Sequence, residues 1–175
     1  MDAGRLVKRA KKGDKEALLQ LVMAEKDAYY RLALTYMKNE HDAMDVMEDM
    51  ILTLYQKIDQ LKKAEAFYSW SKTILVNMCK STFIKQQKII PLESASDAQH
   101  SYLAPFLSSE QRLDIQNMLI HLNDHQREAI ELKYFHDLDY KTIAKITGVS
   151  IGTAKSRIFV GLKKLREIFG GDSNE

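Results

Sequence analysis

With 175 residues, 45% of them apolar and 29% charged, the chain can bury the core of one ordinary domain or two small ones. No apolar run approaches the roughly 18 residues of a membrane span, and residues 1–10 lack the apolar stretch of a signal peptide. The single cysteine, Cys79, excludes an internal disulfide and fits a reducing cytoplasm. Seven glycines, two prolines and long apolar periodicities favour an all-α protein.

Four helical segments are expected before residue 89. Apolar residues recur in them every three or four positions, as on the buried face of an amphipathic helix. The segments cover residues 3–11, one long helix over roughly 15–37 with Asp14 as its N-cap, residues 42–60 and residues 65–87. Cys79 lies in the fourth segment, where we expect a core residue rather than a redox switch.

A linker is expected in the middle of the chain. Residues 89–110 contain both prolines and five serines, but no Lys, no Arg and no helical period. We therefore expect a first domain over residues 1–88, a linker over 89–109, a second domain over 110–170 and a tail over 171–175.

In the second half of the chain, the sequence predicts four helices, near residues 110–121, 124–135, 139–147 and 151–169. Asn123 and Ser150 suit the N-cap positions of the second and fourth, and Gly148 suits the left-handed position that ends the third. Such a short helix, tight turn and basic helix are typical of proteins that place a helix end against DNA. One apolar stripe on the last helix is predicted to face the core, namely Ala154, Ile158, Leu162, Leu165 and Phe169.

A second stripe of this last helix, Gly152, Ser156, Phe159 and Lys163, points away from that core, with Lys155 at its edge. Gly152 falls in the first turn, where a missing side chain lets a partner approach the backbone. The outward Phe159 is either simply exposed, which is common, or packs against a thymine methyl group in a major groove.

Charges are segregated along the chain. Residues 40–49 contain five acids and no Lys or Arg, residues 72–88 contain four lysines and no acid, and residues 151–169 contain five Lys or Arg and one acid. Each run alone fits a solvated face, but three runs in one small protein suggest different partners for different faces.

Four stretches of sequence carry a resemblance to a known family. They are GDKEALLQL (13–21), RLALTYMKNEHDAMDVMEDMILTLYQKIDQL (31–61), AFYSWSKTILVNMCKS (66–81) and LDYKTIAKITGVSIGTAKSR (138–157). In this order, with the proline-bearing linker before the last, they resemble extracytoplasmic-function sigma factors of bacterial RNA polymerase. Four positions depart from the usual pattern: Thr73 replaces a common arginine, Ala154 a valine, and Glu48-Asp49 the usual Gln-Glu.

The resemblance implies a cytoplasmic, non-enzymatic transcription factor of stress responses, with no cofactor and no metal. Such a protein binds core RNA polymerase, recognises the −35 and −10 promoter elements and helps to open the duplex. It implies a helical region 2 bundle and a region 4 helix-turn-helix. It also implies an anti-sigma factor as a partner, which in this family is often membrane-anchored; the chain itself does not enter the membrane.

Three sets of site residues follow from the resemblance together with the charge and aromatic patterns. Carboxylates on one helix face would meet core polymerase: Asp42, Asp45, Glu48 and Asp49. Aromatic rings, an amide and ammonium groups would hold the single-stranded −10 element: Tyr68, Trp70, Lys72, Asn77 and Lys80. Among them, Asn77 matches the family's asparagine that meets an extruded base. The last helix would read the duplex −35 element: Ser150, Gly152, Thr153, Lys155, Ser156, Arg157, Phe159 and Lys163.

Two other functions are weighed against this one. A stand-alone helix-turn-helix regulator explains residues 110–169 but leaves the first ninety without a role. A helical Mg²⁺-dependent nucleotide pyrophosphohydrolase would use the acids of residues 42–49, but its second acidic cluster, Glu128 and Glu131, lies beyond the linker. His121 and His125 have a metal-ligand spacing, although an N-cap at Asn123 would place them on different elements.

Overall fold

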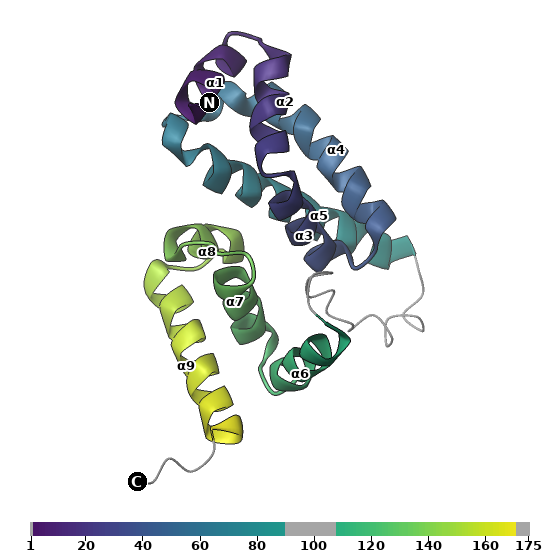
Figure 1. The fold of residues 1–175 in the computed structure, drawn as a ribbon, viewed down its shortest axis with the longest axis vertical. Helices are drawn as coiled ribbons and strands as arrows, with labels where there is room; N and C mark the ends of the chain where they lie inside the picture. Colours follow the sequence, from purple (N-terminus) through teal and green to yellow (C-terminus); the bar gives the residue numbers. More distant parts are fainter. Residues whose placement is uncertain (1, 90–107, 171–175) are drawn as a thin grey trace. The chain divides into compact units, whose positions relative to one another are not determined.

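The computed structural model describes residues 2–89 and 108–170, and every regular element among them is helical (Figure 1). The chain divides into two compact units, residues 1–99 and 100–175. Most of the predicted linker and the whole predicted tail lie outside the described residues. The boundaries expected at residues 88 and 110 therefore stay predictions.

Unit 1, as we call the N-terminal part, is a bundle in which α3 packs against both α4 and α5, and α1 packs against α2. Its elements are α1 (Ala3–Lys11), α2 (Lys15–Ala24), α3 (Lys26–Met37), α4 (Glu40–Lys57), the 3-10 turns η1 (Ile58–Gln60) and η2 (Ala64–Ala66), and α5 (Phe67–Ile89). The predicted N-cap of the second helix is present, because the Asp14 carboxylate accepts a hydrogen bond from the Ala17 N–H at 3.0 Å.

The single helix predicted over residues 15–37 is wrong, because the chain breaks at Glu25 into α2 and α3. In a continuous helix the Leu21 carbonyl would accept from the Glu25 N–H. Instead the Glu25 N–H donates to the Val22 carbonyl, and the Leu21 carbonyl accepts from the Tyr68 hydroxyl of α5 at 3.3 Å. The acceptor freed at the break is thus satisfied by a residue 47 positions further along the chain.

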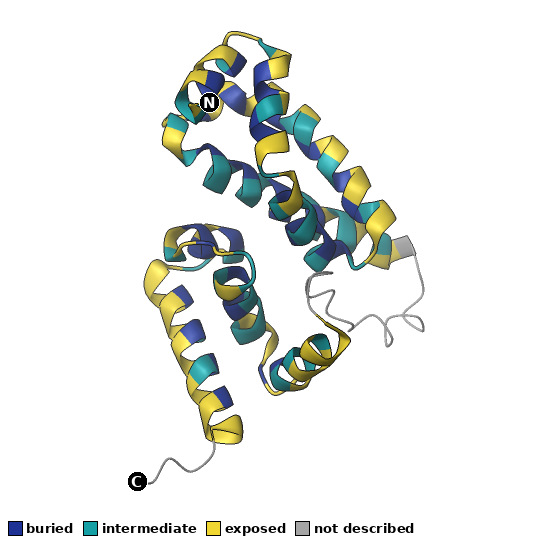
Figure 2. Cartoon of the chain, viewed as in Figure 1, coloured by how far each residue is buried: buried dark blue, intermediate teal, exposed yellow. Residues whose placement is uncertain are grey.

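The core of unit 1 runs along the inner sides of α1 to α5 (Figure 2). Its largest fully buried side chains include Leu18, Leu21, Tyr29, Leu32, Met50, Leu54, Phe67 and Leu75. Cys79 is buried among these helices, as expected, and burial raises the pKa of its thiol to about 12. A thiol that stays protonated is a poor nucleophile, so Cys79 acts as a small core residue.

Unit 2 is the C-terminal part, with α6 (Ser109–Leu119), α7 (Asp124–Tyr134), α8 (Tyr140–Thr147) and α9 (Ile151–Phe169). α9 packs against both α7 and α8. The predicted turn chemistry is present: Gly148 has a φ of 69° and ends α8, while Ser150 accepts from the Thr153 N–H at 3.1 Å and begins α9. Asn123 likewise caps α7.

The predicted core stripe of α9 is only partly correct. Ala154, Ile158 and Leu165 are buried, but Phe169 is 46% exposed and meets the ring of His121 edge-on, with centroids 5.4 Å apart. Gly161 is buried instead: a Cβ there would lie 2.7 Å from the Cδ1 of Ile130. The small residue at this position lets α9 lie close against α7.

Candidate nucleic-acid and polymerase interfaces

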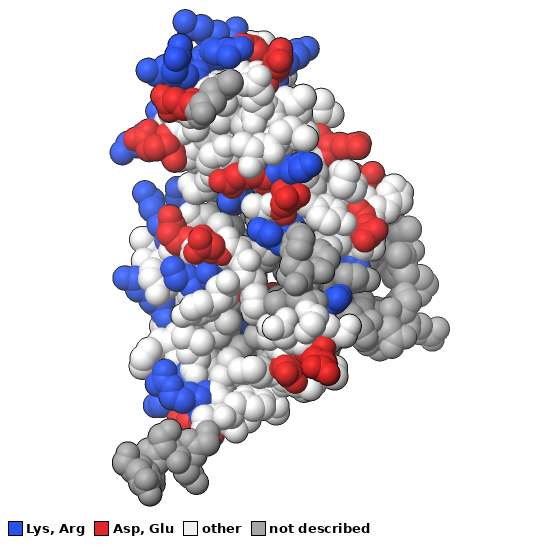
Figure 3. Space-filling view, viewed as in Figure 1, with Lys and Arg blue, Asp and Glu red and all other residues white. Residues whose placement is uncertain are grey.

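The acidic face of α4 is formed by side chains with different surroundings (Figure 3). The Asp42 carboxylate accepts hydrogen bonds from the side-chain amides of Asn39, at 2.6 Å, and Gln86 of α5, at 3.2 Å. It is half-buried and ties α4 to α5. Asp45 is exposed and lies 3.4 Å from the Nδ1 atom of His41 on the same helix. Asp42 is therefore the member of this set with a structural task inside unit 1.

Glu48 and Asp49 are exposed on the same side of α4 as Asp45. Leu52, which sequence reasoning missed, extends this face by one turn and is 64% exposed. Its signal was present in the sequence, since Leu52 falls outside the buried stripe of α4 that includes Met50 and Leu54. An apolar side chain beside exposed carboxylates is a composition that suits binding to another protein.

The outward face of α5 carries Trp70 and Asn77, which are two helical turns apart and therefore lie on one side. Asn77 is exposed and Trp70 is half-buried against the ring of Phe67, with centroids 6.1 Å apart. Lys80 flanks them, with its Nζ atom 5.7 Å from the ring of Tyr36. The structure thus distributes a half-buried ring, an exposed amide and an ammonium group along nearly three turns of α5.

Tyr68 and Lys72 do not join this face. The Tyr68 hydroxyl donates to the Leu21 carbonyl, and the Lys72 Nζ lies 2.6 Å from a carboxylate oxygen of Glu25. The Lys72 side chain is only 13% exposed. Both residues therefore point toward the α2–α3 break rather than toward solvent beside Trp70.

The outer stripe of α9 is as exposed as its spacing predicted. Gly152, Ser156, Phe159 and Lys163 are all exposed, and Phe159 has 70% of its surface accessible. The Nζ of Lys155 lies 5.2 Å from the centre of the Tyr140 ring, which holds the ammonium group beside α8. A cation, a hydroxyl and an apolar ring are thus aligned along one side of a helix.

Among residues 2–89 and 108–170, no neighbour requires glycine at position 152. A Cβ there would meet only the Ser150 hydroxyl, at 3.9 Å, and the backbone has ordinary helical geometry. Glycine is unfavourable within a helix by roughly 1 kcal/mol relative to alanine. The open space beside this first turn is available to a partner that approaches the backbone.

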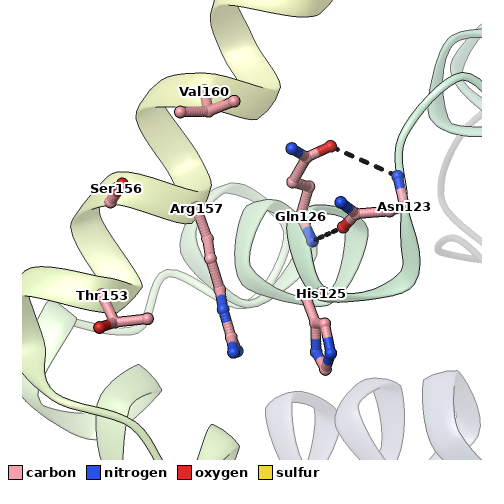
Figure 4. Close-up of a pocket in the computed structure, with 7 residues that line it drawn as sticks. All are labelled: Asn123, His125, Gln126, Thr153, Ser156, Arg157 and Val160. Carbon is pink, nitrogen blue, oxygen red and sulfur yellow. Dashed lines mark hydrogen bonds between the residues drawn. The ribbon is translucent and has the colours of Figure 1, made fainter.

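A shallow pocket of about 300 Å³ lies between the N-terminal half of α9 and the start of α7 (Figure 4). Its lining is polar or cationic apart from one valine, and contains no carboxylate: Asn123, His125, Gln126, Thr153, Ser156, Arg157 and Val160. The Arg157 and His125 side chains extend in the same direction in Figure 4. Sequence reasoning assigned Arg157 but missed His125, which lies 32 positions away in the sequence.

His121 and His125 lie on different elements, as the N-cap at Asn123 predicted, since only His125 belongs to α7. Across residues 2–89 and 108–170, no three side chains of His, Cys, Asp or Glu gather in a way that could hold a metal ion. Over the same residues, each helix is too short or too polar to span a bilayer.

Family models match both units of the chain. The model described as Sigma-70 region 2 matches residues 21–89, and that described as Sigma-70, region 4 matches residues 112–165. The helix-turn-helix of unit 2 and the bundle of unit 1 together thus define a sigma factor.

Curated relatives cover nearly the full length. RNA polymerase sigma factor SigV of Bacillus subtilis is 29% identical over 159 residues, which cover 90% of this chain and 94% of SigV. ECF RNA polymerase sigma factor SigW of the same organism is 28% identical over 174 residues, covering 92% and 93%.

A solved structure agrees with the fold. The sigma factor RpoE of Bartonella quintana, crystallised with the anti-sigma factor NepR, matches with a TM-score of 0.64 and 26% identity, covering 87% of this chain and 96% of RpoE. The chain belongs to the extracytoplasmic-function family of RNA polymerase sigma factors. The predicted all-α fold with two helical units is confirmed.

Proposed function

We propose that this sigma factor divides polymerase binding and promoter recognition among three surfaces on two units. The acidic face of α4 binds core RNA polymerase, the outward face of α5 holds the melted −10 strand, and α9 enters the major groove of the −35 element. The observation that carries the proposal is that these surfaces lie on three different helices, each with a chemistry suited to a different partner.

For core polymerase, the support is the row Asp45, Glu48, Asp49 and Leu52 on one side of α4. These carboxylates are exposed, so a basic partner surface gains charge complementarity without first breaking buried pairs. The exposed leucine adds the apolar contact that protein interfaces use at their centres. Asp42 contributes by holding α4 against α5 rather than by direct contact.

For the −10 strand, the support is the exposed position of Asn77 beside Trp70. Stacking of a base on an aromatic ring is worth about 1–3 kcal/mol, whereas DNA stacking averages about 1.4 kcal/mol per step. The Asn77 amide offers both a donor and an acceptor to an extruded base. A few such contacts offset the cost of unstacking that base only when it has left the duplex.

For the −35 element, the support is the exposed stripe of α9 and the open backbone at Gly152. The free N–H groups at the start of a helix and its dipole favour a phosphate there. Lys155, Ser156 and Phe159 then reach base edges, as a recognition helix does. The pocket that includes Arg157 offers a cationic, carboxylate-free surface to the adjoining phosphate backbone.

The proposal includes an anti-sigma partner, a cytoplasmic location and no enzymatic activity. The solved complex of RpoE with NepR supports the first, and membership in a family of transcription initiation factors supports the others. The rival pyrophosphohydrolase would need carboxylates converging from facing helices. Asp45, Glu48 and Asp49 instead face outward on one helix.

Binding to core polymerase tests the proposal and separates it from a stand-alone helix-turn-helix regulator, which should not bind. Replacing two exposed carboxylates of α4, as in Asp45→Lys with Asp49→Lys, should reduce affinity for purified core enzyme about 100-fold or more. Like charges at an interface cost several kcal/mol, and each 1.4 kcal/mol is a factor of ten. Affinity is measured by fluorescence anisotropy of the labelled full chain.

The matched control is Glu16→Lys with Asp27→Lys, which makes the same charge change at exposed positions on α2 and α3. It should bind core polymerase like the parent. If the α4 variant also binds like the parent, with unchanged circular dichroism, the acidic face is not the docking surface.

A further inference from the structure

A basic surface at one end of unit 1 has no part in the function proposed above. Arg5, Lys8 and Lys12 recur along α1 and its C-cap at intervals of three and four residues, so they share one side of the helix. Lys62 and Lys63, from the segment between η1 and η2, are exposed as well. Figure 3 shows blue atoms gathered at the N-terminal end of this unit, with red atoms of acidic residues beside them.

These five cations are not neutralised within the described part of the chain. Two neighbouring cations have partners: Arg9 pairs with Asp14 at 2.7 Å, and the Lys11 Nζ donates to the Leu61 carbonyl. By contrast, no ion pair or side-chain hydrogen bond involves Arg5, Lys8, Lys12, Lys62 or Lys63 among residues 2–89 and 108–170. The surface therefore presents several free positive charges to a partner.

Stabilisation of α1 alone does not explain this surface. Cations at the end of a helix interact favourably with its dipole, which accounts for Lys8 in the last turn of α1. Arg5 lies at the opposite, positive end of the same helix, where a cation is unfavourable. Lys62 and Lys63 belong to no α-helix. The dipole of α1 therefore does not account for all five cations.

The surface lies beside the end of α5 that carries Trp70. α1 packs against both η1 and η2, and η2 leads directly into α5 at Phe67. The hydrogen bond from Lys11 to Leu61 fixes α1 against the segment that holds Lys62 and Lys63. A strand that leaves Trp70 toward η2 therefore runs toward the elements that carry these cations.

We propose that this α1 surface binds the sugar-phosphate backbone of the single-stranded DNA that α5 holds, beyond the bases at Trp70 and Asn77. The inference rests on the proposed role of α5. An anionic membrane is the less fitting partner, because an interfacial helix inserts an apolar face, and the apolar residues of α1, Leu6, Val7 and Ala10, are buried in the core.

The test compares two fluorescent oligothymidylates bound to the full-length protein. One has about 8 nucleotides, within the roughly 4–16 that a single-strand-binding fold covers, and the other is about three times as long. The parent should bind the longer strand more tightly and with a steeper salt dependence. Lys8→Gln with Lys12→Gln should remove most of this gain and lower the slope of log K against log[salt] by about 1.4, at about 0.7 per phosphate contact.

The control variant, Lys85→Gln with Lys88→Gln, makes the same charge change at exposed positions near the other end of α5 and should keep the gain. Trp70→Ala should weaken binding of both strands, because it removes a stacking ring. If Trp70→Ala weakens both strands while the Lys8/Lys12 variant binds the longer one like the parent, the inference fails and the role of α5 stands.

Two other outcomes would also overturn the inference. In one, the Lys85/Lys88 variant no longer binds the longer strand more tightly than the shorter one. This result would show that the strand runs from Trp70 toward the C-terminal end of α5 instead of toward α1. In the other, the Lys8/Lys12 variant loses binding to phosphatidylglycerol vesicles but keeps the parent's affinity for both strands, which would assign the surface to a membrane.

Discussion

Lys72 is a residue type that often contacts nucleic acid, but its surroundings are those of a residue that stabilises the fold. Its ammonium group lies 2.6 Å from the Glu25 carboxylate and about 6 Å from the rings of Tyr29 and Tyr68. Beneath it, the Tyr29 hydroxyl lies 2.6 Å from the Ser71 hydroxyl in the core, and burial raises the pKa of Tyr29. The ion pair thus covers a polar cluster where α2, α3 and α5 meet.

We expect Lys72→Ala to lower the free energy of unfolding of unit 1 by about 1–3 kcal/mol, because it leaves a half-buried carboxylate without its cation. Lys85→Ala, at an exposed position of the same helix, should change it by less than about 0.5 kcal/mol. Urea unfolding followed by circular dichroism measures both. Normal stability of Lys72→Ala together with weakened binding of single-stranded DNA would instead make Lys72 a nucleic-acid contact.

At the residue scale, the helix caps could be predicted from the sequence, whereas contacts between residues far apart in the sequence could not. The caps at Asp14, Asn123 and Ser150 and the left-handed Gly148 follow from a few neighbouring residues. The Asp139 cap of α8 is of the same kind, since the Thr142 N–H lowers the pKa of its carboxyl group. The inward direction of Lys72 depends on Glu25, 47 positions earlier, which periodicity does not reveal.

At the scale of elements, α9 is the helix whose role is best defined. Its N-cap fixes where it begins, its buried side packs on α7 and α8, and its exposed stripe lies on the opposite side. Lys155→Ala should weaken binding to a −35 duplex by about 1–3 kcal/mol and relax specificity at one base pair, if Lys155 contacts a base edge. Gly152→Val should weaken binding to every duplex, because a side chain would occupy the open space beside the first turn. Selection from a randomised duplex pool, followed by affinity measurements, tests both.

Lys164→Ala is the matched control for Lys155→Ala, since Lys164 is exposed on α9 but lies outside the stripe. It should leave the selected sequence unchanged. An equal loss of affinity for all sequences in Lys155→Ala would show that this lysine contacts phosphates and that the assignment to a base is wrong.

Helix existence was predictable across the described chain, but three features at element scale were not. The break at Glu25 has no glycine or proline to mark it, and depends on the Tyr68 hydroxyl meeting the Leu21 carbonyl. The core stripe of α9 was extended one turn too far, to Phe169, because periodicity does not report where the neighbouring helices end. Gly161, buried against α7, has no apolar signal at all.

At the scale of the whole molecule, two units with separate surfaces fit a protein that must bind a polymerase and two DNA elements at once. The segregation of charge along the sequence predicted that several partners exist. It did not separate Asp42, which packs against Gln86, from the exposed acids of α4, nor did it single out the α1 surface. Both distinctions require knowing which helices pack against each other.

Transcription by purified core polymerase from a library of randomised promoters tests the central claim most directly. The parent chain should direct initiation from a subset of promoters that share two elements, near −35 and −10, at a fixed spacing. The Asp45/Asp49 double-lysine variant should yield no transcripts above those of core polymerase alone. Transcript patterns from the parent that match core polymerase alone would contradict the assignment of this chain as a sigma factor.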